Sequence, residues 1–152
     1  LEDIMLKALI VYGTTTGNTE IVAEQISGIM ENNGVNVTIK NVTDTTVAEL
    51  GNGFDITVLG SSTWGEDSVE FQEDFEPFFE ELDKAELKDK KVALFGCGDS
   101  SYEYYCGAVD LLEEKMDAIG GKRVNDSLRI DGDPSESSSE IDDWAAEVSS
   151  SI

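Results

Sequence analysis

The sequence predicts an α/β fold in which helices cover both faces of a parallel sheet. Short aliphatic and β-branched runs alternate along the chain with segments whose apolar residues recur at helical spacing. Several of these runs are almost continuously apolar, which is typical of strands buried on both faces. A chain of 152 residues, 39% of them hydrophobic, is also the usual size of one compact domain. We therefore expect a three-layer sandwich that forms a single domain over residues 1–152.

Five runs rich in β-branched residues are expected to be the strands of this sheet. They are 7–12 (KALIVY), 35–40 (VNVTIK), 54–60 (FDITVLG), 91–96 (KVALFG) and a part of 122–130 (KRVNDSLRI). Residues 1–5 (LEDIM) precede the first run without an evident role, and we expect them to be a frayed leader.

The segments between these runs carry apolar residues at helical spacing, so we expect helices to follow the strands. Apolar residues recur at this spacing in 21–30, before Asn33-Gly34, a pair suited to a helix C-cap, and again in 109–119 and 141–148. Pro77 interrupts a further segment, 69–82. We expect a short turn of helix there, followed by a second helix that starts near the proline. Residues 135–140 (SESSSE) are expected to be a loop or a helix N-cap.

The charge of the chain limits its partners. Thirty-three acidic residues against ten basic ones give a formal net charge of −23, which would repel nucleic acid and anionic membrane surfaces. Partners are therefore expected to be cationic or small. No apolar stretch is long enough to span a bilayer and no secretory leader is recognisable, so we expect a cytoplasmic protein without a membrane partner.

The residue types that are scarce or absent exclude several chemistries. The chain has no histidine, which removes His-based acid–base catalysis and most transition-metal sites, and we expect no metal. Cys97 and Cys106 are its two cysteines. In a domain of this size two free thiols are favoured over a disulfide.

Three chemically unusual loops follow the first, third and fourth predicted strands. Ligands of parallel sheets bind beyond the carboxyl ends of the strands, so these loops are expected to share one site. The first loop, GTTTGNT (13–19), places hydroxyls and a glycine before a helix, which suits a phosphate group. It lacks the lysine of a nucleoside triphosphate loop, so a monophosphate ester is favoured. The alternative is that Thr and Asn side chains simply cap the helix.

The other two loops carry aromatic residues that could hold a planar ligand. In SSTWGEDS (61–68), Trp64 sits on a loop, where it could cover a ligand ring or merely fold over the end of the sheet. In GCGDSSYEYYC (96–106), the tyrosines could form a second flat surface or pack into the core. For Cys97 and Cys106, the simplest interpretation is that they are small buried hydrophobic residues.

These loops resemble those of a known family. TTTGNT (14–19), STWGEDS (62–68) and CGDSSYEYYCG (97–107) are similar to the phosphate loop and the two ring-binding loops of flavodoxins, specifically the short-chain type of sulfate-reducing bacteria. The resemblance covers nearly the whole chain and extends to LRIDGDP (128–134). It implies a five-stranded sheet in the order 2-1-3-4-5 and flavin mononucleotide (FMN) as the cofactor.

The resemblance also implies which residues bind FMN. The phosphate would be held by the hydroxyls and amides of the first loop, with help from Ser62. Trp64 would cover the inner face of the flavin ring and Tyr102 its outer face. The peptide carbonyl of Gly65 would turn to accept a hydrogen bond from the flavin N5–H on reduction, a movement that a residue without Cβ hinders least. The implied set is Thr14, Thr15, Thr16, Gly17, Asn18, Thr19, Ser62, Thr63, Trp64, Gly65, Cys97, Gly98, Asp99, Tyr102, Tyr104 and Cys106.

The function implied is that of a low-potential one-electron carrier. It would bind FMN non-covalently and shuttle electrons between redox enzymes through the semiquinone/hydroquinone couple, as a monomer that is not itself an enzyme. Its partners would be redox proteins with basic docking patches. The alternative is a flavin-dependent reductase of the same fold. A signalling receiver domain and a cysteine phosphatase are excluded, because their acidic, lysine and arginine positions are not matched.

Overall fold

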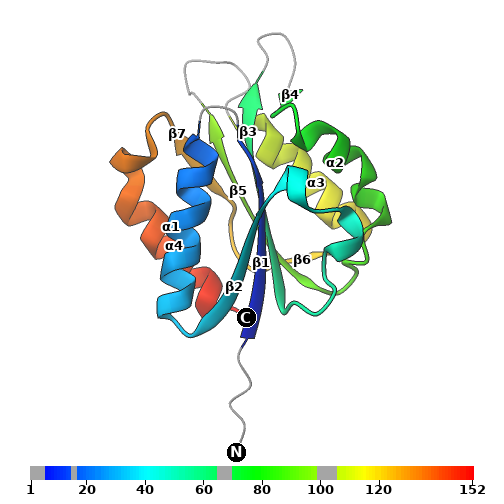
Figure 1. The fold of residues 1–152 in the computed structure, drawn as a ribbon, viewed down its shortest axis with the longest axis horizontal. Helices are drawn as coiled ribbons and strands as arrows, with labels where there is room; N and C mark the ends of the chain where they lie inside the picture. Colours follow the sequence, from blue (N-terminus) through cyan, green and yellow to red (C-terminus); the bar gives the residue numbers. More distant parts are fainter. Residues whose placement is uncertain (1–5, 15–16, 65–69, 99–105) are drawn as a thin grey trace, which may run out of the picture.

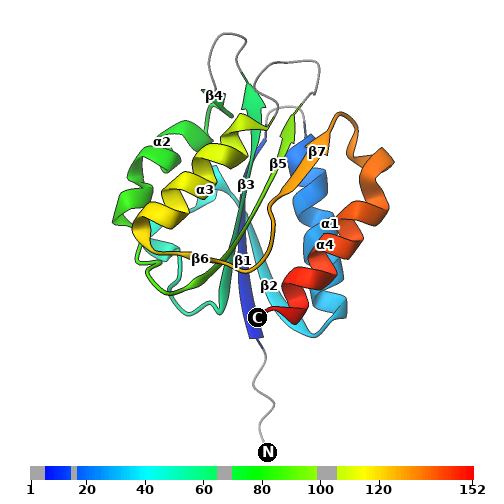
Figure 2. The same ribbon diagram turned by 180° about the vertical axis from the view of Figure 1, so that it is seen from behind.

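The computed structural model describes residues 6–14, 17–64, 70–98 and 106–152, which form three layers (Figure 1). The strands are β1 (Leu6–Gly13), β2 (Val35–Asn41), β3 (Ile56–Trp64), β4 (Glu70–Phe71), β5 (Lys91–Gly98), β6 (Lys122–Arg123) and β7 (Leu128–Asp131). The α-helices are α1 (Asn18–Asn32), α2 (Phe75–Glu81), α3 (Gly107–Ile119) and α4 (Ser138–Ser150). Helices α1 and α4 cover one face of the sheet, and α2 and α3 cover the other (Figures 1 and 2).

The strand order confirms the predicted topology. The main strands are parallel and lie in the order β2-β1-β3-β5, and both β6 and β7 pair with β5 at the edge. The order is therefore 2-1-3-4-5, with the fifth strand divided into two short pieces. Between these pieces, the indole Nε1 of Trp144 in α4 donates a hydrogen bond of 2.7 Å to the carbonyl oxygen of Asp126. The two-residue strand β4 was not predicted, and it pairs antiparallel with the end of β3.

Strand β1 shows why its sequence is apolar without interruption from Ala8 to Val11. Side chains of a strand point alternately to its two faces, and both faces of β1 are covered. Ala8 and Ile10 pack into the core beneath α1 and α4. Leu9 and Val11 pack into the second core, beneath α2 and α3. The continuous apolar run is thus the signature of a central strand shared by two hydrophobic cores.

The segment around Pro77 confirms one part of the prediction and contradicts the other. A helix starts near the proline as expected, since α2 begins at Phe75, two residues before Pro77. The short turn of helix expected before it is wrong, because residues 70–71 form β4. A proline fits here because the amides of the first helical turn have no partner within the helix, so its missing N–H leaves no hydrogen bond unmade. The predicted C-cap of α1 is confirmed, since Gly34 has a φ of 85° and its amide bonds the carbonyl of Glu31 at 3.0 Å.

The helices within the described parts of the chain offer no membrane span. None of them combines the length and the apolar character that crossing a bilayer requires.

Candidate functional site

The ends of β1, β3 and β5 bring the three loops to one edge of the sheet. Gly13 at the end of β1 pairs with Ser61 of β3, and Ser61 pairs in turn with Gly96 of β5. The three strands run in the same direction and end at the same side of the molecule (Figure 1). The expectation that the loops start side by side is therefore confirmed.

The first loop leads into α1 without a side-chain cap. Gly17 is the N-cap residue, with a φ of 95° that suits glycine, and within the described part of the chain no side chain bonds the first-turn amides of α1. The Thr14 hydroxyl instead accepts a hydrogen bond from the Gly17 amide at 3.0 Å, which closes the turn before the helix. Thr14 therefore closes the preceding turn and does not bond a first-turn amide. Thr15 and Thr16 lie outside the described residues, and for them the capping interpretation stays a prediction.

Thr19 carries a hydroxyl group that the fold leaves unused. The side chain is buried, with 1% of its surface exposed, and Oγ1 has no hydrogen-bond partner of normal geometry within the described residues. Leaving such a group unpaired in a protein interior costs about 1–3 kcal/mol. Its place in the first turn of α1 is where the positive end of a helix attracts an anion. A phosphate oxygen would satisfy it, so the residues present fit the phosphate of FMN.

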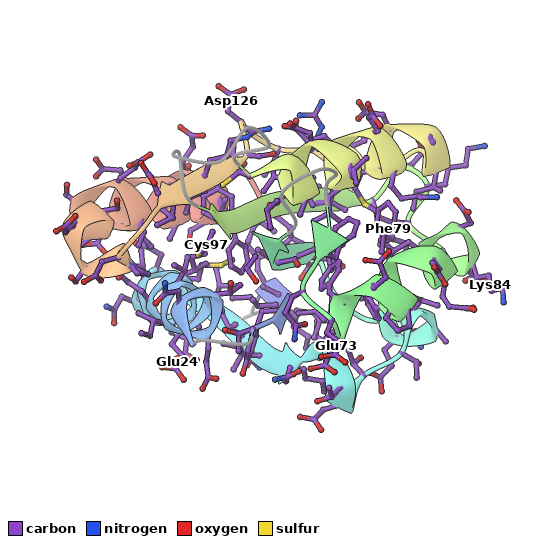
Figure 3. All side chains as sticks on the ribbon, turned by 90° about the horizontal axis from the view of Figure 1, so that it is seen from above. Glu24, Glu73, Phe79, Lys84, Cys97 and Asp126 are labelled. Atoms are coloured by element: carbon purple, nitrogen blue, oxygen red, sulfur yellow. The ribbon has the colours of Figure 1, made fainter. Side chains whose placement is uncertain are left out.

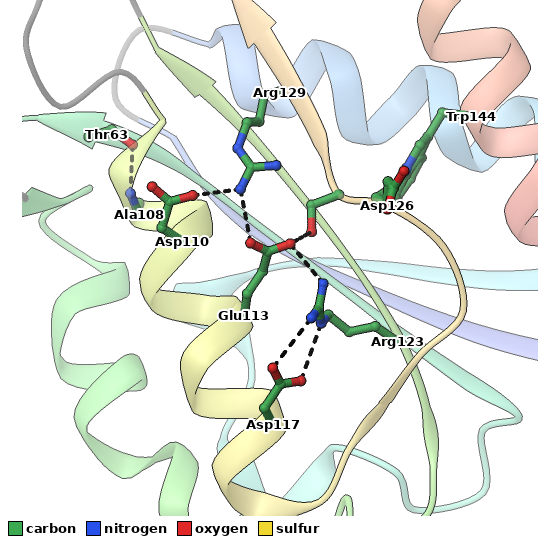
Figure 4. Close-up of polar contacts among 10 residues, drawn as sticks. Thr63, Ala108, Asp110, Glu113, Asp117, Arg123, Asp126, Arg129 and Trp144 are labelled. Atoms are coloured by element: carbon green, nitrogen blue, oxygen red, sulfur yellow. Dashed lines mark hydrogen bonds and ion pairs between the residues drawn. The ribbon is translucent and has the colours of Figure 1, made fainter.

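The end of β3 is fixed to the start of α3. The hydroxyl of Thr63 accepts a hydrogen bond of 3.0 Å from the backbone amide of Ala108 (Figure 4). Ser62 is half-buried next to it, opposite Cys97 of β5 in the sheet. The second and third loops therefore leave from positions that are held together. Gly65, which follows Trp64 in the second loop, lies outside the described residues.

Both cysteines are buried and form no disulfide. Burial raises the pKa of the Cys97 thiol to about 11, and the neighbouring Thr19 hydroxyl offsets part of this effect. The Cys106 thiol lies 3.9 Å from the carbonyl oxygen of Gly96 and 3.9 Å from that of Ile130. These surroundings agree with the interpretation that the cysteines act as small buried residues next to the loop.

The third loop leaves from β5 and returns at Cys106. Gly98 is half-buried, and its carbonyl oxygen accepts a hydrogen bond of 2.9 Å from the amide of Gly132, beyond β7. Cys106 has a φ of 50°, in the left-handed region that residues other than glycine seldom adopt, directly before α3. Both ends of this loop are thus fixed by the scaffold. Asp99, Tyr102 and Tyr104 lie outside the described residues.

Gln72 is a buried residue at this edge that the sequence analysis missed. It lies between β4 and α2, with 2% of its surface exposed. Its side-chain amide donates a hydrogen bond of 3.2 Å to the carbonyl oxygen of Thr14 in the first loop. The one feature of the sequence that could have drawn attention to it is a glutamine among acidic and aromatic residues, FQEDFE (71–76). Its partner is 58 residues away along the chain, and no local pattern identifies such a contact.

The electrostatic environment at the end of β1 is negative. The pKa of Tyr12 is raised above its ordinary value, mainly by burial and then by the charges of Glu20, Glu24 and Asp44. Viewed from the loop end, Glu24 lies at the outer side of the molecule, whereas Cys97 lies between the helical layers (Figure 3). Among the described residues, no group of acidic and cysteine side chains has the arrangement of a metal site.

The two arginines of the chain are both engaged by α3 (Figure 4). Arg129 of β7 bonds Asp110 at 2.6 Å and Glu113 at 3.0 Å. Arg123 of β6 bonds Glu113 at 2.9 Å and Asp117 at 3.3 Å. These ion pairs fix the divided edge strand to the helix, and they leave the guanidinium groups occupied.

A cleft of about 590 Å³ lies at the division between β6 and β7, lined by six residues. None of them belongs to the three loops. They are Asp117, Arg123, Val124, Asn125, Asp126 and Glu147.

Comparison with known proteins decides the family. The flavodoxin family model matches residues 10–144. A flavodoxin of Maridesulfovibrio salexigens is 53% identical over 148 residues, which cover 97% of this chain and 100% of that protein. The chain belongs to the flavodoxin family. A flavodoxin of Nitratidesulfovibrio vulgaris is 43% identical over 95% of this chain and 97% of its own length.

Solved structures agree with this assignment. Flavodoxin 2 from Bacillus cereus superimposes with a TM-score of 0.88 at 32% identity, over 96% of this chain and 99% of that one. A Fusobacterium nucleatum flavodoxin variant bound to flavin mononucleotide has a TM-score of 0.81 at 20% identity, over 97% and 98% of the two chains, and shows the shared fold. Flavodoxins are low-potential electron carriers that use FMN, and this chain is one of them.

Proposed function

We propose that the chain acts as a single FMN-binding domain whose first loop holds the phosphate. The observation that carries this proposal is the buried hydroxyl of Thr19, which has no hydrogen-bond partner of normal geometry among the described residues and lies in the first turn of α1. Phosphate oxygens accept hydrogen bonds from hydroxyls and from free helix amides, so one ligand group would satisfy both. The proposed phosphate-binding residues are Thr14, Thr15, Thr16, Gly17, Asn18, Thr19 and Ser62.

The second and third loops are proposed to hold the flavin ring. FMN supplies the ability to accept and release single electrons, and the chain supplies binding and shielding. Support comes from the paired ends of β3 and β5 and from the Thr63 contact to α3, which give both loops a common rigid base. The proposed ring-binding residues are Thr63, Trp64, Gly65, Cys97, Gly98, Asp99, Tyr102, Tyr104 and Cys106.

We propose further that the protein is a carrier rather than an enzyme. A reductase that uses NADPH needs a cation for the nucleotide phosphate, and arginine is the usual choice. Arg123 and Arg129 are both bound by carboxylates of α3, which does not favour that role. NADPH:quinone reductase activity of the purified protein alone would overturn this part of the proposal.

The partners are proposed to be redox proteins with basic docking patches, met by a monomer in the cytoplasm. The net charge of −23 supports attraction to a basic surface, and two buried free thiols suit a reducing compartment. Since salt screens such attraction, the rate of electron transfer to a basic partner should fall as ionic strength rises. A rate that does not depend on salt would contradict the docking proposal, and size-exclusion chromatography tests the monomer.

Acidic residues of the ring loops are proposed to lower the potential of the second electron. Each carboxylate would repel the negative charge of the fully reduced flavin. Two unit charges about 10 Å apart, at an effective dielectric of about 40–80, repel by about 0.4–0.8 kcal/mol. This corresponds to about 15–35 mV for each carboxylate, or roughly 100 mV for five. Converting them to amides should raise the second potential cumulatively and the first one less. The five residues are Glu66, Asp67, Glu70, Asp99 and Glu103.

The test of the proposed binding mode is a fluorescence titration of the apoprotein with FMN and with riboflavin, which lacks the phosphate. If the first loop holds the phosphate, removing that group leaves buried donors unpaired, and riboflavin should bind at least tenfold more weakly. Equal dissociation constants for the two flavins would refute the phosphate site. A protein that takes up neither flavin would refute the function as a whole.

A further inference from the structure

Gln72 occupies a position between the first loop, the end of β3 and the start of α2. Its side-chain Nε2 donates to the carbonyl oxygen of Thr14 at 3.2 Å and to the Asp74 carboxylate at 3.1 Å. Its Oε1 accepts hydrogen bonds from the amides of Asp74 and Phe75, each at 3.1 Å. Its backbone amide donates to the hydroxyl of Ser61 at 3.3 Å. The buried side chain of Gln72 thus joins the first loop to the start of α2, and its backbone amide joins both to the end of β3.

The contact with the first loop is close as well as polar. A Cβ atom built on Gly13 would lie 2.5 Å from Oε1 of Gln72 and 3.1 Å from Cβ of Phe75. The backbone at the end of β1 therefore packs directly against the glutamine amide. The Thr14 carbonyl that follows is held by Nε2, which sets the direction in which the chain enters the loop.

The two ends of the Gln72 amide perform different tasks. The acceptor end binds the first amides of α2, a task that the carboxylate of a glutamate could also perform. The donor end binds the Thr14 carbonyl and the Asp74 carboxylate, and an ionised carboxylate has no donor for either. A glutamate at this position would lose both contacts, and its charge would face Asp74 and repel a phosphate, so the clean test is an uncharged replacement.

We propose that Gln72 is a positioning residue for the phosphate of FMN. By fixing the Thr14 carbonyl, it fixes the turn that the Thr14 hydroxyl closes on the Gly17 amide, and hence the direction of the free amides of α1. Its backbone contact with Ser61 connects the same arrangement to the strand that leads into the second loop. This inference rests on the proposed function, because it takes the first loop to be the phosphate site.

The experiment compares FMN and riboflavin binding in the wild type and in the variants Gln72→Met and Gln72→Leu, neither of which adds a charge near the first loop. Both variants are expected to raise the dissociation constant for FMN about tenfold, whereas the constant for riboflavin should change less than about threefold. Gln25→Leu is the matched control. The Gln25 amide also joins two elements, since it donates to the Ser138 carbonyl at 3.0 Å and to the Asp142 carboxylate at 2.7 Å, but it does so between α1 and α4. This control should leave both constants unchanged.

The outcomes separate the inference from the proposed function. If the wild type binds FMN and riboflavin equally, the phosphate site itself is wrong. If the wild type discriminates and both Gln72 variants discriminate equally well, Gln72 does not position the phosphate loop. Equal losses for both flavins would also overturn the inference, because they would indicate a general structural role. Should Gln72→Leu fail to fold, Gln72→Met, whose unbranched side chain is closer in length to that of glutamine, decides the question, with thermal unfolding of the apoprotein as the check on folding.

Discussion

Replacing Thr19 by valine should change stability and cofactor affinity in opposite directions. Valine has nearly the same shape as threonine and the same branching at Cβ, so the packing of this buried position should persist. The substitution replaces by a methyl group a buried hydroxyl that lies beside the Cys97 thiol and has no hydrogen-bond partner of normal geometry in the described part of the chain. Since an unpaired buried hydroxyl costs about 1–3 kcal/mol, the apoprotein should become more stable by about that amount. For a chain of 152 residues this raises the melting temperature by about 2–4 °C per kcal/mol.

Cofactor binding should weaken in the same variant. A hydrogen bond to a charged group contributes about 1.5–3 kcal/mol, so losing one to the phosphate should raise the dissociation constant for FMN by about 10–150-fold. Riboflavin binding should not change, because riboflavin carries no phosphate. The assays are calorimetric unfolding of the apoprotein and fluorescence titration with both flavins.

Thr43→Val is the control for this experiment. The Thr43 hydroxyl is exposed and already donates to the Asn41 side chain at 3.1 Å, outside the three loops. Its loss should leave FMN binding unchanged and should not stabilise the apoprotein. Unaltered FMN affinity in Thr19→Val would refute the assignment of this hydroxyl to the phosphate. A less stable apoprotein would show that the hydroxyl has a partner in the free protein.

Three further predictions concern the thiols, the packing and the second loop. Because the pKa of Cys97 is raised to about 11, its alkylation by iodoacetamide should be slow near about pH 8. The rate should rise about tenfold per pH unit up to about pH 11. Rapid labelling of Cys97 near about pH 8, followed by peptide mass spectrometry, would contradict this. Gly96→Ala should lower the free energy of unfolding by about 1–3 kcal/mol, because its Cβ would lie 2.4 Å from Cγ2 of Val109. Gly28 lies inside α1 with open space where a Cβ would be, so Gly28→Ala should raise the free energy of unfolding by about 0.5–1 kcal/mol. If urea denaturation shows that both variants change this free energy in the same direction, the packing argument is wrong. Gly65→Ala should hinder the peptide turn and lower the maximum amount of half-reduced flavin that accumulates during a reductive titration. If that maximum is unchanged, Gly65 has no part in the mechanism.

Local patterns were sufficient for the main elements of the fold. The central strands were predictable because the part of a strand that is covered on both faces is continuously apolar, as after Lys7 in β1 and after Lys91 in β5. The C-cap of α1 was predictable because Gly34 supplies the left-handed conformation there. Strand β4 was not predictable, since two residues contain no detectable period and their pairing depends on β3.

The candidate site shows the same division between local and tertiary information. The three loops could be found from the sequence because their unusual residues follow strands, and the resemblance supplied their roles. The state of the Thr19 hydroxyl could not be predicted, because it depends on what surrounds it in the folded chain. The link between Gln72 and Thr14 and the engagement of both arginines by α3 are likewise contacts between distant segments, which no spacing rule reveals.

The central claim, that this chain is a low-potential one-electron carrier, is tested most directly by an anaerobic redox titration of the FMN-loaded protein followed by its visible spectrum. A carrier of this kind should show two separate one-electron steps, with the second potential well below the first and a stable half-reduced form between them. A single two-electron step, or a protein that takes up no FMN from solution, would contradict it.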